Sequence, residues 1–488
     1  MISKSQFLKY IQCYKYLWLY KFRRELLPEE VDASLQRIFD EGYEIEDYAK
    51  KLFPKGVEVE GLYDKAEKHT KKLIKEGNKL LFQATAMANK LYCMADIFSY
   101  NPKTKKWDIY EVKSSTKLKD IHIIDLAFQK TCFEGAGYEI GKLHLVHVNN
   151  QYVRKGKIDP KKLLKIEDLT SEVKNVISGV HLDIENALEL ITKKDEPQVK
   201  ILKQCKNPFG CNFIGYCWKD IPEHSIYNIA GSLTEKKLNE LLDQGIIMIK
   251  DIPDDYLTKH KSILHHNVIK QNKIHIEKEN IKSELSKLKY PLYFLDYETF
   301  SPAIPMFDGY KPYQRIVFQF SLHVQESKGA KLKHYEFLAK DKKDPTNDLL
   351  KALKSFVKGI GTFIAWNDVF EKGCNREMAR RAPKYSDFLQ EINNSMYDLM
   401  MIFRNGYYVH KNFHGSASIK KVLPVIVPKL SYKDLEIQEG GTASQSWLTL
   451  IDESVKKSER NKLATDMLKY CELDTFAMVE ILRKLKEI

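Results

Sequence analysis

Residues 290–300 read YPLYFLDYETF, and this stretch decides how the second half of the chain is interpreted. A short apolar run that follows a charged segment and a proline is typical of a buried β-strand. Asp296 and Glu298 are two residues apart near the end of the run, so a strand places both carboxylates on one face. Buried carboxylates are costly unless a cation neutralises them. The stretch therefore predicts a metal-binding strand, with an acidic pair on an edge strand as the alternative.

The sequence beyond this strand predicts a mixed α/β domain over residues 286–488. Strand-like runs recur, helical segments alternate with them, and a long helical pattern closes the chain. The strand-like runs are RIVFQFSLHV at 315–324, LKHYEFLA at 332–339 and GTFIAW at 361–366, and the closing helix covers 459–488.

Further acidic residues in this domain extend the predicted metal site. Glu371 lies in AWNDVFEKG, where a strand runs into a helix. Tyr470 and Asp474 are four apart on the closing helix and share a face. We expect Asp296, Glu298, Glu371 and Asp474 to hold two Mg²⁺ or Mn²⁺ ions about 4 Å apart. Tyr470 would then orient or deprotonate the nucleophile, whereas a solvated helix face is the alternative for Tyr470 and Asp474.

The first block, residues 1–225, also predicts mixed α/β structure and a second cluster of charged residues. Asp96 lies in the strand-like run LYCMADIFSY, and Glu111 and Lys113 lie on the next run, WDIYEVKSS. Glu111 and Lys113 share a face of their strand, and a hairpin brings Asp96 beside them. The two carboxylates would hold Mg²⁺ or Mn²⁺, and the lysine would orient a water or stabilise developing charge. A solvated hairpin with surface charges is the alternative.

Composition and charge restrict the classes of function. The 488 residues suit two or three domains, and 79 Lys and Arg against 66 Asp and Glu give a formal charge of +13. That balance fits a polyanionic partner such as nucleic acid. We find no membrane-length apolar run and no signal peptide, so we expect a cytoplasmic protein with reduced thiols. Residues 226–285 are predicted as a helical linker, or half of a helix-hairpin-helix that binds phosphates.

Three cysteines, Cys205, Cys211 and Cys217, recur at intervals of six, which suggests a metal site in a reducing compartment. Cys13 on the predicted N-terminal helix offers a fourth thiolate. Unrelated buried thiols are the alternative. Ser418, Lys420 and Lys421 form a basic helix start that could contact a phosphate backbone or be a solvated helix end.

The first block resembles PD-(D/E)XK nucleases of the RecB type, including the iron–sulfur exonucleases of CRISPR adaptation. The resemblance implies a restriction-endonuclease-like fold, with Lys113, Gln129 and Glu46 in catalytic roles. It also implies a [4Fe–4S] cluster on Cys13, Cys205, Cys211 and Cys217, for which a Zn²⁺ site is the alternative. The chain departs from this family in two places. Phe133 stands four residues after Gln129, where the family has a tyrosine, and Cys205 and Cys211 are spaced more widely than the corresponding cysteines of the family.

The third block resembles the DEDDy 3′–5′ exonucleases, which have a ribonuclease H-like fold. Glu371 stands where that family carries aspartate. The stretches from Pro312 and from Ala417 resemble an uncharacterised bacterial family that joins both nuclease modules. The resemblance implies a two-site nuclease that trims DNA ends. An RNA exonuclease is one alternative. A nucleic-acid-binding scaffold with degenerate sites is another, and Phe133 and Glu371 favour it because they depart from the motifs of the two nuclease families. Protein partners are not indicated.

Overall fold

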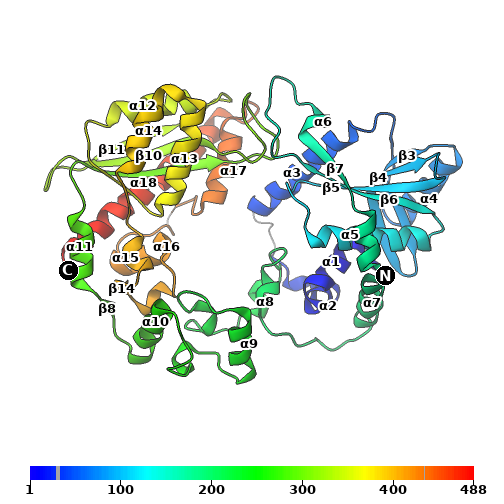
Figure 1. Cartoon of the computed structure of the whole chain (residues 1–488), viewed down its shortest axis with the longest axis horizontal. Helices are drawn as coiled ribbons and strands as arrows, with labels where there is room; N and C mark the ends of the chain where they lie inside the picture. The colour runs from blue at the N-terminus through cyan, green and yellow to red at the C-terminus, as the bar shows by residue number, and fades with distance from the viewer. Residues whose placement is uncertain (29–32, 434) are drawn as a thin grey trace. The chain divides into compact units, whose positions relative to one another are not determined.

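The computed structural model describes residues 1–28, 33–433 and 435–488. The chain forms two compact units, each with its own sheet (Figure 1). Unit 1 comprises Met1–Asp220 and Pro302–Gln314, and unit 2 comprises Ile221–Ser301 and Arg315–Ile488. The predicted mixed α/β class is confirmed. Within the described residues, no helix is both long and apolar enough to cross a membrane.

The sheet of unit 1 has the strand order β2-β3-β4-β5-β6-β7, with β1 paired to the start of β4. Strands β3, β4 and β5 form an antiparallel meander, and β6 pairs with β5 in parallel after a crossover through α5 (Asp120–Gly135). The strands are β1 (Ile2–Ser3), β2 (Val57–Glu58), β3 (Leu80–Ala88), β4 (Leu91–Asn101), β5 (Lys106–Lys113), β6 (Ile140–Val148) and β7 (Leu164–Asp168).

Helices cover both faces of this sheet. Helices α1, α5 and α7 share one core with Leu81, Phe98 and Ile109, and α3 packs on a second core with Phe82 and Val146. A capping box starts α1, since Ser3 accepts from Gln6 N at 3.2 Å. The helices are α1 (Lys4–Gln12), α2 (Tyr14–Phe22), α3 (Ala33–Lys50), α4 (Asp64–Lys75), α6 (Pro160–Leu163), α7 (Thr170–Leu190) and α8 (Ile214–Cys217), with 3₁₀ turns η1 (Arg24–Leu26) and η2 (Lys203–Cys205).

Strand β3 changes face at Gln83. This residue has a φ of +55°, a left-handed conformation that is uncommon for a residue with a side chain. Leu81 and Ala84, three residues apart, consequently pack in the same core. Strict alternation would have separated them. Such conformations persist only where the surroundings enforce them, and they gather at functional sites.

A segment of the second half of the chain completes unit 1. Residues 302–314 follow β9 (Leu292–Phe300) and pack in the core that contains Val146 and Ile45. Ala303 is 1 % exposed, and the Tyr313 hydroxyl donates to the carbonyl of Ser114 at 2.6 Å. Backbone bonds join Arg154 to Tyr310 and Gly309 at 3.0 and 2.8 Å. Unit 1 is therefore built from two stretches that are distant in the sequence.

The sheet of unit 2 has the order β11-β10-β9-β12-β13. Its central strand β9 (Leu292–Phe300) is antiparallel to β10 (Ile316–Gln325) and parallel to β12 (Thr362–Ala365). The edge strands are β11 (Lys333–Leu338) and β13 (Met396–Asp398). The strands predicted at 290–300, 315–324, 332–339 and 361–366 are thus confirmed within a residue or two.

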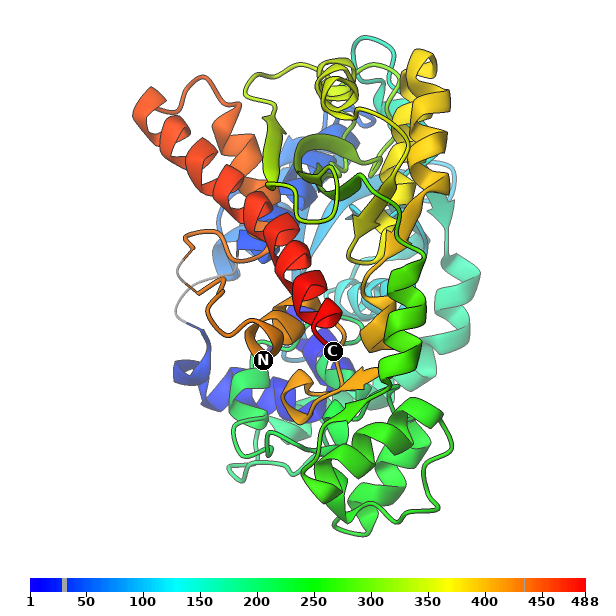
Figure 2. The ribbon, with the colours of Figure 1, turned by 90° about the vertical axis from the view of Figure 1, so that its left-hand side faces the viewer.

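Helices lie on both faces of this second sheet. One face packs on α12 (Thr346–Phe356), α13 (Asp368–Arg381) and α14 (Ser386–Asn394) through Tyr293, Leu295 and Tyr297. The other face meets α18 (Lys457–Lys486), the long closing helix, which is red in Figure 2. Alternation along β9 turns Asp296 and Glu298 toward α18.

Shorter elements complete unit 2. Residues 226–285 are largely helical and share a small core of Ile226, Leu241 and Ile249. They contain η3 (Ile226–Asn228), α9 (Glu235–Asp243), η4 (Ile249–Asp251), α10 (His260–Gln271), β8 (His275–Ile276) and α11 (Lys278–Ser286). Strand β8 pairs with β14 (Tyr408–Val409), so this segment folds as part of unit 2. The remaining elements are η5 (Pro383–Tyr385), α15 (Met401–Arg404), η6 (Lys411–Phe413), α16 (Ile419–Ile426) and α17 (Gly440–Leu450).

Candidate active sites

Three carboxylates converge between β9 and α18 in unit 2. One oxygen each of Asp296, Glu298 and Asp474 lies within 4.8 Å of the others. Glu298 is 8 % exposed and Asp474 is 9 % exposed. The strand supplies two of the acids and the helix that covers it supplies the third, so packing of α18 on β9 assembles the group. The structure therefore brings together three of the four acids that the sequence predicted for this site.

Burial makes these carboxylates hard to ionise. Burial, followed by repulsion from Asp474, raises the pKa of Asp296 and of Glu298 well above the usual range. Burial also raises the pKa of Asp474, to about 6, although hydrogen bonding by Tyr432 and the charge of Lys420 oppose the rise. Acids that repel one another in a desolvated place are stabilised by a cation placed among them. The group has the chemistry of a site for hard divalent ions, which prefer oxygen ligands.

Polar side chains surround the acids. The Tyr432 hydroxyl donates to Asp474 Oδ1 at 2.5 Å, and Tyr470 also hydrogen-bonds to Asp474. Burial, followed by the charge of Asp474, raises the pKa of Tyr470, so the phenol keeps its proton at neutral pH. The Lys420 Nζ lies 5.7 Å from both tyrosine rings. Tyr470 can therefore orient a group here, while its raised pKa opposes the role of a base.

Glu371 lies near the three acids but outside their group. It is 2 % exposed on α13, and its Oε2 has no hydrogen-bond partner among the described residues. Burial raises its pKa to about 8, and the charges of Asp368 and Asp398 add to the rise. Arg315, which pairs with Glu377 at 2.5 Å, opposes it. Glu371 therefore offers a buried carboxylate oxygen that no described group satisfies.

A second charged cluster lies on β5 and α5 in unit 1. Lys113 pairs with Glu111 and, at 3.0 Å, with Asp125 Oδ2. Gln129 Nε2 donates to Glu111 Oε2 at 2.6 Å and to Asp125 Oδ1 at 2.9 Å. The Nζ of Lys4, the first residue of α1, lies 2.9 Å from both oxygens of Glu111. Lysine and glutamine nitrogens thus bridge these carboxylates.

The charges of this cluster are strongly coupled. Burial and then Glu111 raise the pKa of Asp96 to about 7. Glu111 is equally buried, but Lys113 and Lys4 hold its pKa well below the usual range. Asp96 also accepts a hydrogen bond from Val112 N at 2.7 Å, which fixes its place beside β5. The arrangement can exchange one of its ammonium groups for a metal ion without leaving Glu111 unpaired.

The structure also places the remaining residues predicted for this cluster. Glu46 on α3 accepts from Gln83 Nε2 at 2.6 Å, and Gln83 reaches Asp96 Oδ1 at 3.5 Å. The unusual backbone of Gln83 thus links Glu46 to the cluster. Phe133 is fully buried and stacks on Phe98 with ring centroids 4.6 Å apart, so it serves the core.

The four predicted cysteine ligands line one pocket of about 330 Å³ in unit 1. Cys13 lies at the junction of α1 and α2, with an extended backbone that ends one helix and starts the next. Gln12 Nε2 donates to the carbonyls of Gln204 and Phe209 at 2.8 and 2.7 Å, which ties this junction to the other cysteines. Burial raises the pKa of Cys211 to about 12.

The spacing of these thiols bears on the type of metal. Four sulfurs about 2.3 Å from one zinc ion lie within about 4 Å of one another. Among the described residues, no three of these sulfurs come within 4.8 Å of each other. All four thiols are unpaired and half-buried around the shared pocket. The arrangement as it stands is too wide for a single ion.

Several site residues were missed by sequence reasoning. Lys4 directly follows the two-residue strand β1, in which Ile2 pairs with the distant Leu91, so no local pattern places Lys4. Asp125 is one turn before Gln129 and lies within the apolar stretch IIDLAF of α5, a signal that could have been used. Tyr432 lies outside helices and strands, and its contact with Asp474 arises only on folding.

The comparisons with known proteins concern parts of the chain. Residues 293–418 match a family described as "Domain of unknown function (DUF2779)". Over 224 residues the chain is 29 % identical to the Uncharacterized protein MG366 of Mycoplasma genitalium, covering 42 % of this chain and 34 % of that protein. The Uncharacterized protein MG366 homolog of Mycoplasma pneumoniae is 31 % identical over 222 residues, 41 % of this chain and 33 % of that protein.

A third relative matches a longer stretch. The Uncharacterized protein UU173 of Ureaplasma parvum serovar 3 is 26 % identical over 342 residues, 65 % of this chain and 49 % of that protein. This chain thus spans less than half the length of each of these relatives. The family match includes Asp296, Glu298 and Glu371 but ends before Asp474. None of these descriptions states an activity.

Proposed function

We propose that this chain is a cytoplasmic, metal-dependent nuclease with two active sites that trims DNA ends. The observation that carries the proposal is the group of Asp296, Glu298 and Asp474, which gathers three carboxylates within 4.8 Å in a largely desolvated place. A fold retains so costly an arrangement where a bound cation compensates it. Divalent ions bound there would polarise a phosphodiester and lower the pKa of an attacking water.

The protein's own residues around this group have roles that suit phosphodiester hydrolysis. Tyr470, which keeps its proton, would orient the attacking water or a phosphate oxygen by donating a hydrogen bond. Lys420, whose charge lowers the pKa of both Glu298 and Asp474, would offset the negative charge of the substrate. Glu371 would complete the ligand set. These residues, with the strand order β11-β10-β9-β12-β13, support a 3′–5′ exonuclease of ribonuclease H-like fold.

Unit 1 would supply the second active site, of the PD-(D/E)XK type. Asp96 and Glu111 would hold the metal, and Lys113 would stabilise charge that develops on the phosphate. Gln129 contacts both Glu111 and Asp125, so it would position the ligands. Glu46 acts on the cluster through Gln83. The antiparallel hairpin that carries the acids, followed by a helix and a parallel strand, supports this assignment.

The cysteine pocket would hold a [4Fe–4S] cluster. Its four thiols line one cavity, which is the layout that a group bound by four cysteines needs. A cluster there would cross-link the α1–α2 junction to residues 205–217 and contribute to folding of unit 1. The thiols, of which Cys211 has a pKa raised to about 12, would release protons on binding.

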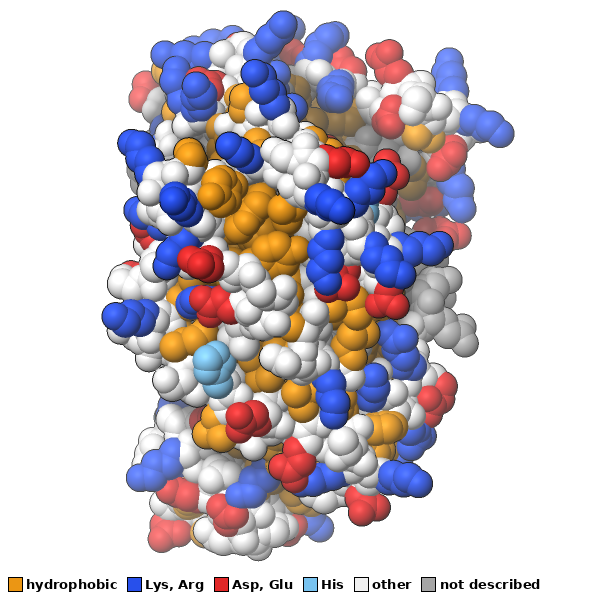
Figure 3. Space-filling view, turned by 90° about the vertical axis from the view of Figure 1, so that its right-hand side faces the viewer, with side chains coloured by type: hydrophobic (Ala, Val, Ile, Leu, Met, Phe, Trp, Pro, Cys, Tyr) orange, Lys and Arg blue, Asp and Glu red, His pale blue; other side chains and the backbone are white. Residues whose placement is uncertain are grey.

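A nucleic-acid substrate agrees with the charge of the chain, which has a formal value of +13. Lys and Arg side chains are spread over the face in Figure 3 and do not gather into one patch there. RNA in place of DNA is an alternative substrate. A scaffold with degenerate sites is a further alternative, which the intact groups of acids disfavour.

Cleavage of end-labelled nucleic acid tests the proposal. Single- and double-stranded DNA and RNA are incubated with the full chain in Mg²⁺ and then in Mn²⁺. The wild type is compared with Lys113→Ala, Asp296→Ala and the double variant. Lys71→Ala and Asp341→Ala serve as matched controls, because both side chains are exposed and pair with Glu67 and Lys343, outside the predicted sites.

Each outcome has a distinct meaning. If each single variant loses a different product ladder while both controls stay active, two working sites are supported. The ladder that each variant loses then shows from which end of the strand that site cleaves. Faster cleavage of RNA than of DNA would favour the RNA exonuclease. A wild type that binds nucleic acid without cleaving it under either metal would refute the nuclease and favour the scaffold.

A further inference from the structure

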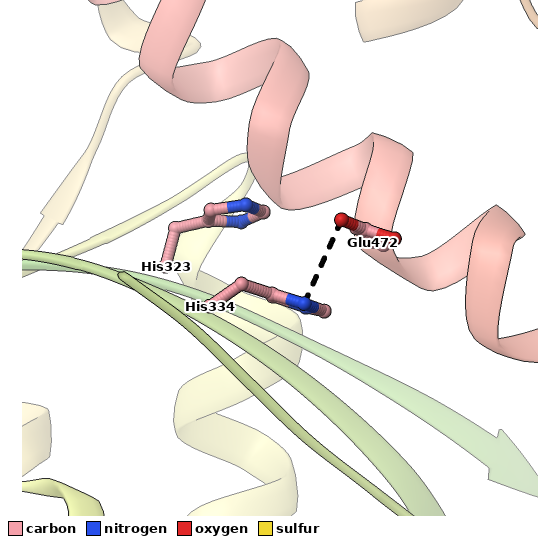
Figure 4. Close-up of side chains that lie close together, drawn as sticks. All are labelled: His323, His334 and Glu472. Atoms are coloured by element: carbon pink, nitrogen blue, oxygen red, sulfur yellow. Dashed lines mark ion pairs between the residues drawn. The ribbon is translucent and has the colours of Figure 1, made fainter. Parts of the chain in front are cut away.

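Two histidines and a glutamate meet in unit 2 at a place distinct from the three acids described above. His323 on β10, His334 on β11 and Glu472 on α18 each bring one ligand atom within 4.8 Å of the others. His323 and His334 are opposite each other in the strand register, and their rings stack with centroids 4.4 Å apart. Figure 4 shows both rings beside the helix that carries Glu472.

A chain of hydroxyl groups holds both rings in place. His323 Nδ1 lies 2.8 Å from the Thr475 hydroxyl, and His334 Nε2 lies 2.9 Å from the Ser321 hydroxyl. These two hydroxyls are themselves 2.7 Å apart. Ser321 precedes His323 by two residues on β10, and Thr475 follows Glu472 by three on α18. One nitrogen of each ring therefore has a hydroxyl partner.

One arrangement of hydrogens satisfies this chain. The Thr475 hydroxyl lies 3.0 Å from the carbonyl of Glu472, to which it can donate its single proton. With that donation made, Ser321 donates to Thr475 and accepts from His334 Nε2, and His323 Nδ1 donates to Thr475. In this arrangement each imidazole keeps a lone pair on its remaining nitrogen, Nε2 of His323 and Nδ1 of His334.

The remaining nitrogen of His334 approaches a carboxylate. His334 Nδ1 lies 3.6 Å from Glu472 Oε1, which is longer than an ordinary hydrogen bond. Two imidazole nitrogens and a carboxylate oxygen within 4.8 Å of one another have the composition of a metal site. Hydrogen bonds to the second nitrogen of each ring are typical of histidines that bind metals.

We propose that His323, His334 and Glu472 bind a divalent transition-metal ion, Zn²⁺ foremost, in unit 2. Two nitrogens and one carboxylate suit Zn²⁺ better than Mg²⁺, which prefers oxygen ligands. The site therefore differs in chemistry from the all-carboxylate group of Asp296, Glu298 and Asp474. His323 is 4 % exposed, whereas the side chains of His334 and Glu472 are 22 % and 48 % exposed. An ion can enter from that side, and water can fill a fourth position.

The location suggests what the ion does. It would join the β10–β11 hairpin to α18 at a residue two positions before Asp474. Because that helix also carries Tyr470, the ion would fix the register of α18 on the sheet and thereby the position of the third acid. The proposal does not depend on nuclease activity, since the ligands and their hydrogen bonds stand whether or not the chain cleaves nucleic acid.

Zinc titration of the chelator-treated full chain tests the site. Excess Mg²⁺ is present throughout to occupy the carboxylate group, and free Zn²⁺ is followed with a competing chromophore. The wild type is compared with Glu472→Gln, with Ser321→Ala and with the matched control Glu459→Gln, an exposed acid in the first turn of the same helix. The cysteine pocket is unchanged in all four proteins, so differences among them report the new site.

We expect the wild type and Glu459→Gln to bind one more equivalent of Zn²⁺ than Glu472→Gln. Ser321→Ala should keep that equivalent with affinity weakened by about 10- to 100-fold, as for other hydrogen-bond partners of metal-bound histidine. Co²⁺ in the same equivalent should show absorption bands typical of nitrogen and oxygen ligands, without thiolate bands.

Equal stoichiometry and affinity in wild type and Glu472→Gln would overturn the proposal. So would a Co²⁺ spectrum for the lost equivalent that contains thiolate bands. Because Glu472 is half exposed, Glu472→Gln is expected to fold, and matching circular dichroism and melting of the metal-free proteins checks this. If Glu472→Gln does not fold, His334→Gln replaces it in the same comparison.

Discussion

The ammonium group of Lys4 contacts both oxygens of Glu111. Replacing Lys4 should therefore lower the stability of the metal-free protein and, at the same time, raise its affinity for a metal ion. In the structure the Lys4 Nζ lies 2.9 Å from each oxygen of Glu111 and 3.7 Å from Asp125. Glu111 is 1 % exposed, and Lys113 is its other cationic partner. Lys4→Met keeps the length and apolar stem of the side chain and removes the charge. The variant therefore isolates the electrostatic contribution of Lys4.

Two opposing effects follow, and both can be sized. Removing one partner of a buried ion pair costs about 3–5 kcal/mol, and because Lys113 remains we expect about 2 kcal/mol less stability without metal. A divalent ion at Glu111 must displace or repel the ammonium group of Lys4. Two unit charges 4 Å apart interact by about 4 kcal/mol at an effective dielectric constant of 20, so relief of even a third of this gives about tenfold tighter binding.

The assay is calorimetric titration with Mn²⁺ in a Glu298→Gln background, which weakens the competing site in unit 2. Hydrogen exchange of β5 peptides reports the local stability of unit 1 without metal. Lys71→Met, an exposed lysine on α4 of the same unit, is the matched control and should change neither quantity. If Lys4→Met leaves Mn²⁺ affinity unchanged or weakens it, then Lys4 does not compete with the metal and our account of the cluster is wrong.

Three further predictions concern pH, the cysteine pocket and packing. Because the pKa of Asp474 is raised to about 6, the metal-free folded state keeps a proton that the unfolded state has lost; stability should fall as pH rises from about 4 to 6, by roughly 3 kcal/mol from this group alone. Thermal melting without divalent ions should show that slope, and Mn²⁺ should flatten it. Cys211→Ser should abolish the visible absorbance of anaerobically reconstituted protein and lower its melting temperature, and absorbance equal to wild type would contradict the pocket assignment. Gly361→Ala should destabilise unit 2 by about 1–3 kcal/mol in urea unfolding, because the new Cβ would meet the Pro291 carbonyl oxygen at 2.0 Å, whereas Gly210→Ala, with open space around it, should be neutral.

The sequence predicted those parts of the molecule that depend on local pattern. The run YPLYFLDYETF becomes β9, and the closing helical pattern becomes α18, because apolar periodicity reports how a segment is buried. The acids Asp296, Glu298 and Asp474 converge as expected, since a strand and a helix each fix the direction of the side chains. The predicted cysteines also meet at one pocket.

Other parts could not be read from the sequence because they arise from long-range packing. Lys4 contacts Glu111 because the two-residue strand before it pairs with β4. A lysine at the start of a helix does not by itself predict that contact. His323 and His334 are separated by a hairpin and become neighbours through strand register, which a single sequence does not specify. Glu371 was predicted as a ligand, and the structure places it beside the three acids without joining their group.

The segment at 302–314 makes the two units depend on each other during synthesis. Ala303 and Tyr313 fill a core whose other members, such as Ile45 and Val146, are made much earlier. A ribosome must therefore pass residue 314 before unit 1 can be complete, and until then the nascent N-terminal half exposes an apolar surface. A gene fragment that ends near residue 220 would encode an unfinished unit, prone to aggregate or to need a chaperone. Residues 1–220 can consequently be transferred to another protein only together with residues 302–314.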